Sequence, residues 1–334
     1  MRKFFKYIYH NIICFILLNV RVDLLLQSRG KNKRLIIMYH GVRVGNKRIN
    51  GRHITAWHFE KQLEYFKENF AIVSLHELCA MKAQGITPDR RTIALTFDDG
   101  FLNNLTVALP LLEKYNIPAT FFLCTAGITD PRYAHPTDRV DMIRMASASS
   151  LIQIGDESFY RYGHVVVGQK SEKHAYHYII NKLSYPDWLR MNDSLAAQLD
   201  EKIVAQHSEV YHLVSDQDVK DLAHSKLVRL GSHGHQHVNF LTLSREESQF
   251  QLLASKNVLE GYSRPVDVIA FPYGYFNSTL ITLAKEAGYR YLIAGGHVDP
   301  PYDRDVFPRI GVLDGAGFSY TMLMISNGFR RFGF

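Results

Sequence analysis

Short apolar runs alternate with segments of helical periodicity along most of this chain. Strands are expected at 35–39, 72–74, 92–97, 119–123, 226–230, 268–271 and 291–294, and helices at 57–66, 107–115, 246–259 and 280–287. Within this set, the apolar run from Ile93 to Phe97 is broken only by Thr96, which is typical of a buried strand. Because strands and helices alternate repeatedly, the pattern predicts a parallel α/β architecture.

Residues 130 to about 215 depart from this pattern. They are rich in Tyr, His, Ser and charged residues, their periodicity is weak, and they separate two well-patterned halves. We interpret them as a mostly helical insertion beside the functional site, within a single domain that spans 35–334. Their sequence does not indicate what the insertion binds.

Composition and charge describe an ordinary globular body with a basic N-terminus. Of the 334 residues, 46% are hydrophobic and 21% charged, and the formal net charge is +7. The first 34 residues hold eight basic side chains and one acidic one, whereas the remaining 300 hold 31 of each sign. The body is therefore electrically balanced, and no nucleic-acid partner is expected.

Residues 7–20 form a mostly apolar run between basic residues. The run is too short and too polar for a transmembrane helix, and no small residues follow it as a signal-peptide cleavage site. We interpret 1–34 as a segment that lies in an anionic membrane surface, with packing against its own domain as the alternative. Basic residues are denser after the run than before it, which favours a body at the cytoplasmic face of an inner membrane.

The three cysteines, Cys14, Cys79 and Cys124, are widely spaced. Without a Cys-x-x-Cys pair they predict neither a disulfide framework nor a thiolate metal site. This usage is compatible with a reducing compartment.

Two adjacent carboxylates and a glycine, Asp98, Asp99 and Gly100, follow the strand expected at 92–97. The carboxyl ends of strands are where α/β folds build active sites. Side chains alternate along a strand, so one carboxylate could bind a metal while the other takes a proton. Asp-Gly is also common in turns, and at this point a solvated turn and a catalytic pair remain equally open.

A histidine-rich segment, Gly-Ser-His-Gly-His-Gln-His, follows the strand expected at 226–230. His233 and His237 are four residues apart, so a single helical turn would place both on one face and would turn His235 away. A polar surface loop is the alternative. Combined with a carboxylate from another strand end, two imidazoles would form a hydrolytic metal site with positions left for water and substrate.

Three motifs closely resemble those of NodB-type polysaccharide deacetylases. They are Thr-Phe-Asp-Asp-Gly at 96–100, the histidine pair after Gly-Ser, and Phe-Pro-Tyr-Gly at 271–274. Flanking segments at 38–42, 117–122 and 285–289 match too, and the resemblance covers roughly 35–130 and 216–312. It implies an enzyme that removes N-acetyl groups from sugars, with a distorted (β/α) barrel fold and a bound divalent metal, usually zinc.

The resemblance also implies a role for each motif residue. Carried over by position, the metal ligands are Asp99, His233 and His237. Asp98 is the general base that deprotonates the attacking water, while the cation lowers the pKa of that water and stabilises the oxyanion. The backbone N–H of Tyr273 matches the family's second oxyanion donor, and Pro272 and Tyr273 belong to the turn that walls the sugar pocket.

The sequence departs from the family pattern in two places. An arginine that pairs with the base is usual two residues before Pro-Tyr-Gly, where this chain has Ala270; Arg309 is our candidate substitute. The usual C-terminal strand that ends in a histidine general acid is also missing. The strand 35–39 resembles that strand moved to the front of the chain, as in circularly permuted members, which makes His40 our candidate acid ahead of His297.

These observations favour a metal-dependent N-deacetylase of a cell-envelope glycan. The basic, apolar N-terminus favours a lipid-linked or nascent sugar at the inner membrane over mature wall. Two alternatives stay open: a non-catalytic glycan-binding relative, suggested by the missing arginine and displaced acid, and a hydrolase of another C–N bond such as a cyclic amide.

Overall fold

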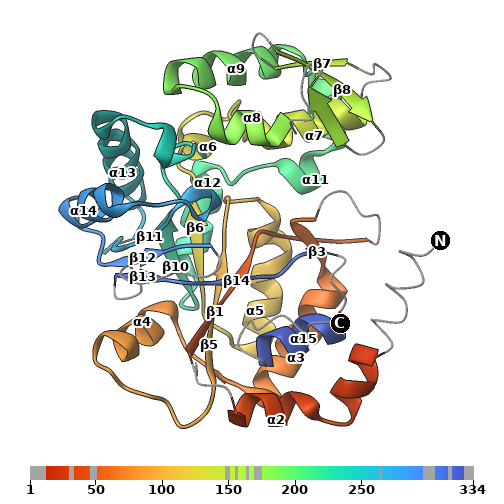
Figure 1. Cartoon of the computed structure of the whole chain (residues 1–334), viewed down its shortest axis with the longest axis vertical. Coiled ribbons are helices and arrows are strands. Elements are labelled where there is room, and N and C mark those ends of the chain that lie inside the picture. Colours follow the sequence, from red (N-terminus) through yellow and green to blue (C-terminus); the bar gives the residue numbers. More distant parts are fainter. Residues whose placement is uncertain are drawn as a thin grey trace.

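The structure is a computed structural model. It describes residues 13–29, 34–45, 51–146, 151–154, 157–162, 165–168, 175–263, 265–295, 305–314 and 318–326. Figure 1 shows a sheet with helices packed around it, covered at one end by the helices and strands of the insertion.

The central sheet has nine strands, and all of its pairings are parallel. Its strands are β1 (Arg34–Tyr39), β4 (Ala71–Ile72), β5 (Thr92–Phe97), β6 (Ala119–Leu123), β10 (Val228–Ser232), β11 (Val268–Ala270), β12 (Tyr291–Ile293), β13 (Val306–Phe307) and β14 (Ile310–Gly311). Their order is β13-β12-β11-β10-β6-β5-β1-β14, with β4 beside β5. The predicted parallel α/β architecture is confirmed.

The two ends of this sheet are joined by consecutive residues of the chain. β13 pairs with β12 at one end, β14 pairs with β1 at the other, and only Pro308 and Arg309 separate them in sequence. The sheet is therefore curled so that its two end strands approach each other. These strands are connected through residues 308–309 and, among the described residues, not through a ladder of hydrogen bonds. This is the distorted (β/α) barrel that the motifs imply.

Helices cover the outside of the barrel. They are α3 (Ala56–Asn69), α4 (Leu75–Ala83), α5 (Leu109–Tyr115), α12 (Asp216–His224), α13 (Arg245–Leu259), α14 (Ser278–Glu286) and α15 (Phe318–Ser326), with a π-helical turn at Asn104–Ala108 before α5. Capping decides several boundaries: Ser74 and Glu77 form a capping box that begins α4, which shortens the strand expected at 72–74 to β4. Asn116, in the left-handed conformation, ends α5.

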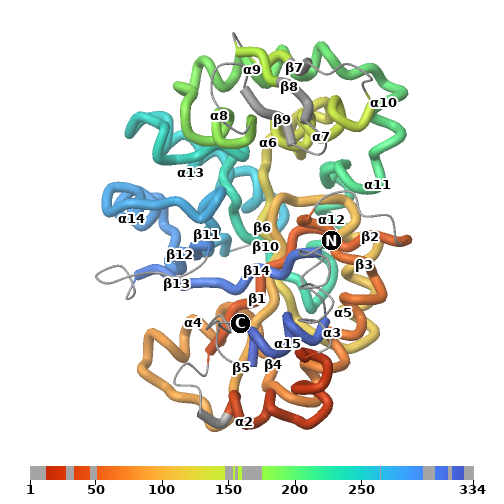
Figure 2. Tube along the Cα trace, turned by 45° about the vertical axis from the view of Figure 1, so that its right-hand side comes forward, coloured from red at the N-terminus to blue at the C-terminus, as the bar shows by residue number. Residues whose placement is uncertain are grey.

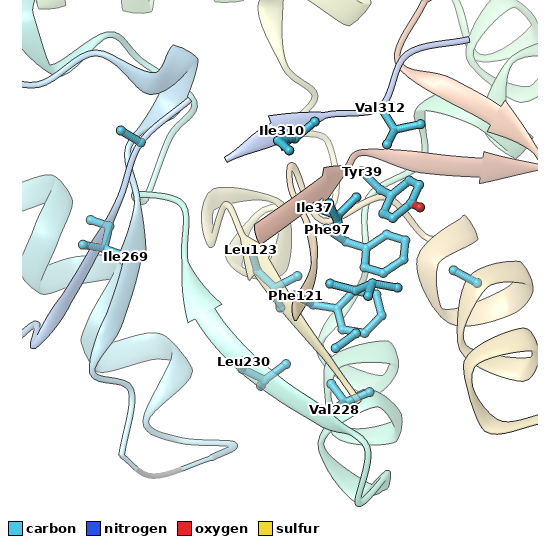
Figure 3. Packing of buried hydrophobic residues seen from close by; sticks show 14 of the residues in the cluster. Ile37, Tyr39, Phe97, Phe121, Leu123, Val228, Leu230, Ile269, Ile310 and Val312 are labelled. Carbon is cyan, nitrogen blue, oxygen red and sulfur yellow. The ribbon is translucent and has the colours of Figure 1, made fainter. Parts of the chain in front are cut away.

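The barrel core is built from the residues of the apolar runs. In Figure 3, Ile37, Tyr39, Phe97 and Phe121 point from neighbouring strands into one cluster. The rings of Phe97 and Phe121 stack with centroids 4.8 Å apart, and both side chains are fully buried. Burial of such a side chain contributes about 1.5–3 kcal/mol, so the apolar strands fix the frame on which the site stands.

The insertion is largely helical but also contains a small sheet. It follows α6 (Ala126–Thr129) and comprises α7 (Pro136–Ala146), β7 (Leu151–Ile154), β8 (Glu157–Tyr162), β9 (Val165–Gly168), α8 (Ala175–Asn181), α9 (Tyr185–Ala197), α10 (Glu201–Gln206) and α11 (Ser208–Tyr211). The antiparallel sheet β7-β8-β9 was not predicted, because its strands lack clear alternation. Trp188, Phe159 and Ile179 belong to a separate hydrophobic cluster that holds the insertion together.

The N-terminal segment packs partly on the domain. Residues 13–19 are helical, Arg21 adopts a left-handed conformation, and α2 (Val22–Arg29) follows. Buried Asp23 accepts a hydrogen bond from Tyr65 of α3, and Gln27 donates one to Ser326 of α15. Figure 2 shows α2, α3 and α15 together at one end of the molecule.

Among the described residues, no helix is both long and apolar enough to cross a membrane. The three cysteines are buried free thiols.

Candidate active site

Four strands deliver polar side chains to one end of the barrel. His40 follows β1, Asp98 and Asp99 follow β5, and His233 follows β10, each at the carboxyl end of its strand. Together with Tyr273, which follows β11, these residues line a cavity of about 900 Å³. The site therefore lies where parallel α/β barrels place their catalytic groups.

Asp99, His233 and His237 converge on one point. Asp99 Oδ1 lies 3.5 Å from His233 Nε2 and 3.3 Å from His237 Nε2, and the three ligand atoms all lie within 4.8 Å of one another. All three side chains are buried. The segment between the histidines is a bend around Gly234 (φ +78°) and not the helical turn that we expected. His235 does turn away, with its Nδ1 2.9 Å from Thr125 Oγ1.

The geometry of this triad fits a small divalent cation. Ligands about 2.0–2.1 Å from a tetrahedral zinc ion lie about 3.3–3.4 Å apart, close to the two observed separations. Asp99 Oδ1 is buried, and no donor in the part of the chain that the structure describes forms a hydrogen bond with it. His233 Nδ1 lies 2.7 Å from the carbonyl oxygen of Ala270, and donating to it directs the lone pair of Nε2 toward Asp99.

Electrostatics favour the metal-binding protonation states of Asp99 and His237. Burial would raise the pKa of Asp99, but His237, His40 and His233 outweigh it and hold that pKa well below its usual value. Burial lowers the pKa of His237 to about 3, although Asp99 acts in the opposite direction. A carboxylate and a neutral imidazole are the metal-binding forms of these groups. For His233, burial would lower the pKa, but Asp98 and Asp99 raise it above its usual value.

Asp98 is paired with Arg309. The guanidinium makes two hydrogen bonds, 2.6 Å from Nη1 to Oδ1 and 2.7 Å from Nη2 to Oδ2 of Asp98. Both side chains are buried, with 1% and 3% exposure. Burial would raise the pKa of Asp98, but Arg309 and His233 lower it below the usual value of a carboxyl. Arg309 comes from the two residues that close the barrel, so it reaches Asp98 by a different path from the family's usual arginine.

His40 is held beside Asp98 by strand register. Tyr39 of β1 is paired with Phe97 of β5, and the backbone N–H of Asp98 donates to the carbonyl oxygen of Tyr39 at 3.0 Å. The His40 ring lines the cavity, and its buried Nδ1 has no hydrogen-bond partner among the described residues. Burial lowers the pKa of His40, although Asp99 and Asp98 raise it. His297, the other candidate acid, lies outside the described residues.

The Pro-Tyr-Gly turn forms a strained edge of the cavity. Tyr273 has φ +58° and Gly274 has φ +75°, and a Cβ atom on Gly274 would lie 2.6 Å from the backbone nitrogen of Gly295. Tyr273 lines the cavity, and its ring centroid lies 4.4 Å from that of His237. Pro272 is buried and is not among the described residues that line the cavity.

Sequence reasoning missed an arginine and two acids in the site. Arg52, just before β3 (His53–Thr55), donates from Nη1 to Asp99 Oδ2 at 3.2 Å. Its Nη2 also pairs with fully buried Asp138 and lies 3.8 Å from Asp141, both on α7. The only available signal in the sequence was a stretch at 135–141 in which five of the seven residues are polar, and the structure buries all seven.

Acids and imidazoles gathered at the carboxyl ends of a parallel α/β barrel define a hydrolytic enzyme site. Residues 85–292, more than half of the chain, match the family model for polysaccharide deacetylases. The chain belongs to the polysaccharide deacetylase family, whose members are carbohydrate esterases that act on C–N amide bonds. The predicted fold, family and enzyme class are thereby confirmed.

The chain is also similar in sequence to individual polysaccharide N-deacetylases. The chain is 24% identical over 301 residues, 86% of its length, to a poly-β-1,6-N-acetyl-D-glucosamine N-deacetylase of Staphylococcus aureus (strain MSSA476), of which the match covers 81%. It is 33% identical over 111 residues, 29% of its length, to an enzyme of the same description from Staphylococcus epidermidis. That second match spans only 38% of the Staphylococcus epidermidis protein.

Solved structures share the fold. The chain resembles IcaB from Ammonifex degensii, with a TM-score of 0.57, 15% identity and coverage of 89% of this chain and 98% of that one. It also resembles the Streptococcus pyogenes deacetylase PplD in complex with acetate, with a TM-score of 0.54, 16% identity and coverage of 86% and 95%.

Proposed function

We propose that this protein is a metal-dependent N-deacetylase that removes N-acetyl groups from a cell-envelope polysaccharide and releases acetate. The observation that carries the proposal is the Asp99–His233–His237 triad beside an arginine-paired Asp98 in one cavity. In this proposal the triad holds the cation, for which zinc is the first candidate because two imidazoles and one carboxylate suit it. The cation supplies Lewis acidity, which lowers the pKa of water and polarises a carbonyl oxygen.

The residues around the triad divide the proton transfers. Asp98 is ionised, and its pairing with Arg309 leaves it fixed in orientation, so it is our proposed base for the attacking water. His40, neighbouring Asp98 through the pairing of β1 and β5, is our proposed acid that protonates the leaving amine. Tyr273 lines the same cavity in a left-handed conformation, and its backbone N–H is our proposed donor to the developing oxyanion.

For the substrate we propose a polymer of N-acetylglucosamine, free or attached to a lipid carrier. It is supported by the two staphylococcal relatives, which are poly-β-1,6-N-acetyl-D-glucosamine N-deacetylases. The charges in the cavity agree, because Arg52 and Arg309 are each paired with carboxylates, so neither calls for an anionic sugar.

The decisive experiment is an acetate-release assay with a metal measurement. We expect the purified protein to bind about one zinc-like ion per chain at the triad. It should release acetate from β-1,6-linked N-acetylglucosamine oligomers, and the Asp98→Asn protein should retain the metal but lose activity. Turnover of Asp98→Asn at the wild-type rate would remove Asp98 as the base. Sugar binding without acetate release by the wild-type protein would instead identify a non-catalytic glycan-binding relative.

We also propose that the N-terminal segment binds the anionic face of a membrane, on the cytoplasmic side. Five large apolar side chains on it are 44–64% exposed: Phe15, Ile16, Val20, Leu24 and Leu25. The first 34 residues carry all of the formal net charge of +7. Apolar side chains flanked by cations match a surface of anionic lipid.

Vesicle co-sedimentation tests this second proposal. The protein should sediment with phosphatidylglycerol vesicles more than with phosphatidylcholine vesicles, and Leu24→Ser/Leu25→Ser should reduce that fraction several-fold. Ile86→Ser, which alters an exposed apolar residue outside the segment, is the matched control. Equal sedimentation of the double variant and the wild-type protein would refute the proposal.

A further inference from the structure

The cavity is larger than the reaction at one N-acetyl group requires. At about 900 Å³ it lies at the upper end of the range of about 300–1,000 Å³ for pockets that enclose drug-sized ligands. One of its walls is formed by the insertion, through Thr137, Asp141, Arg144, Tyr176 and Ile180. None of these residues belongs to the motifs of the family.

The spacing of residues along α7 and α8 places the polar side chains of this wall toward the cavity. On α7, Asp141 and Arg144 face the cavity, while Val140 and Ile143, each one position earlier, are buried in the hydrophobic cluster of the insertion. On α8, Tyr176 likewise faces the cavity, and its neighbour in sequence is buried in that cluster. The wall therefore stands on two helices that are anchored from behind and is fixed before any ligand binds.

Asp141 organises the polar part of the wall. Its Oδ1 accepts a hydrogen bond from the Tyr176 hydroxyl at 2.5 Å and lies 3.0 Å from Arg144 Nη2. Its Oδ2 accepts one from the Tyr211 hydroxyl at 3.2 Å and lies 3.8 Å from Arg52 Nη2. The last contact links the wall to the site, because Arg52 also donates to Asp99.

The charges of the wall identify the kind of ligand. Arg144 is neutralised by Asp141, so the wall offers N–H donors, carboxylate acceptors and an aromatic ring without a net charge. Anionic ligands would have to compete with Asp141 for the guanidinium. Hydroxyl groups can use both partners at once, and the ring of Tyr176 can pack against the C–H face of a sugar.

We propose that Asp141, Arg144 and Tyr176 form a subsite for a second, uncharged sugar ring, linked to the ring whose N-acetyl group is hydrolysed. The inference rests on the proposed function. It assigns the insertion the task of selecting oligosaccharides over single sugars.

The test compares β-1,6-linked N-acetylglucosamine tetrasaccharide with the monosaccharide. Wild-type kcat/KM should be higher for the tetrasaccharide, and Arg144→Ala should lower the ratio of the two kcat/KM values about tenfold, the effect of losing roughly one hydrogen bond to a charged group. Tyr176→Ala is an independent second variant and should lower the same ratio. Arg190→Ala, on the solvent side of α9 with 74% exposure, is the matched control and should leave the ratio unchanged.

Each outcome decides the inference separately from the function. A ratio that is unchanged in both folded variants, as judged by thermal unfolding, overturns the subsite while leaving deacetylation intact. If the wild-type protein releases no acetate from either sugar, the proposed function fails. Calorimetric titration with the tetrasaccharide then decides the subsite: binding weakened about tenfold by Arg144→Ala supports it, and no wild-type binding or equal binding overturns it.

Discussion

Removal of Arg309 should destabilise the protein more than any surface charge change. In Arg309→Met the side chain keeps most of its volume, but Asp98 is left as a buried carboxylate without the partner that now donates two hydrogen bonds at 2.6 and 2.7 Å. Loss of one partner of a buried ion pair costs about 3–5 kcal/mol of unfolding free energy. Asp98 is only 3% exposed, so solvent can compensate for the lost partner only weakly.

A double-mutant cycle isolates the pair. Asp98→Asn/Arg309→Met removes both charges, so its loss in unfolding free energy should be smaller than the sum of the single losses by about 1–3 kcal/mol. Urea unfolding at a fixed metal concentration measures the four proteins, because metal binding itself shifts stability. Arg245→Met breaks an exposed pair with Glu286 and should change stability by less than about 1 kcal/mol. Strictly additive single losses would refute the reasoning.

Three further predictions concern the metal, the turn and the insertion. His237→Ala should weaken zinc affinity at least about 100-fold in competition with a chelating dye, since even partners of ligands contribute 10–100-fold, whereas His235→Ala should not. Gly274→Ala should lower both the unfolding free energy and kcat/KM, because the added Cβ would lie 2.6 Å from a backbone atom. The control Gly85→Ala has a similar φ of +69° but open space around it, so it should lower the unfolding free energy by only about 1 kcal/mol in urea unfolding. Trp188→Ala should lower stability by about 3–5 kcal/mol in the same assay, since its fully buried ring fills the core of the insertion.

The barrel could be predicted from sequence because its strands are buried on both faces. Strands of this kind consist of nearly continuous apolar residues, which are easy to recognise in a sequence. Accordingly, β1, β5 and β6 begin and end within one residue of the expected bounds. α15 was not expected, because its nine mostly apolar residues show no clear helical periodicity of apolar and polar positions. The small sheet of the insertion was missed for the same reason.

Most of the site could be predicted because its residues lie in motifs, while Arg309, outside them, was inferred from the missing arginine at position 270. Asp99, His233 and His237 were grouped by motif, and the structure brings them together, while their roles and those of Asp98, His40 and Arg309 stay predictions. Arg52 could not be found, because its position beside Asp99 depends on a loop far away in sequence. Membrane binding by 1–34 also stays a prediction.

The closure of the barrel by residues 308–309 has a consequence for synthesis of the protein. β1 is made first, but its partner β14 emerges more than 270 residues later, so a growing chain carries β1 with one edge unpaired. Throughout that time Asp98 also lacks its arginine. Until β14 leaves the ribosome, the nascent chain therefore carries an open strand edge that can pair with other chains, and Asp98 acquires its counter-charge in the same step that closes the sheet.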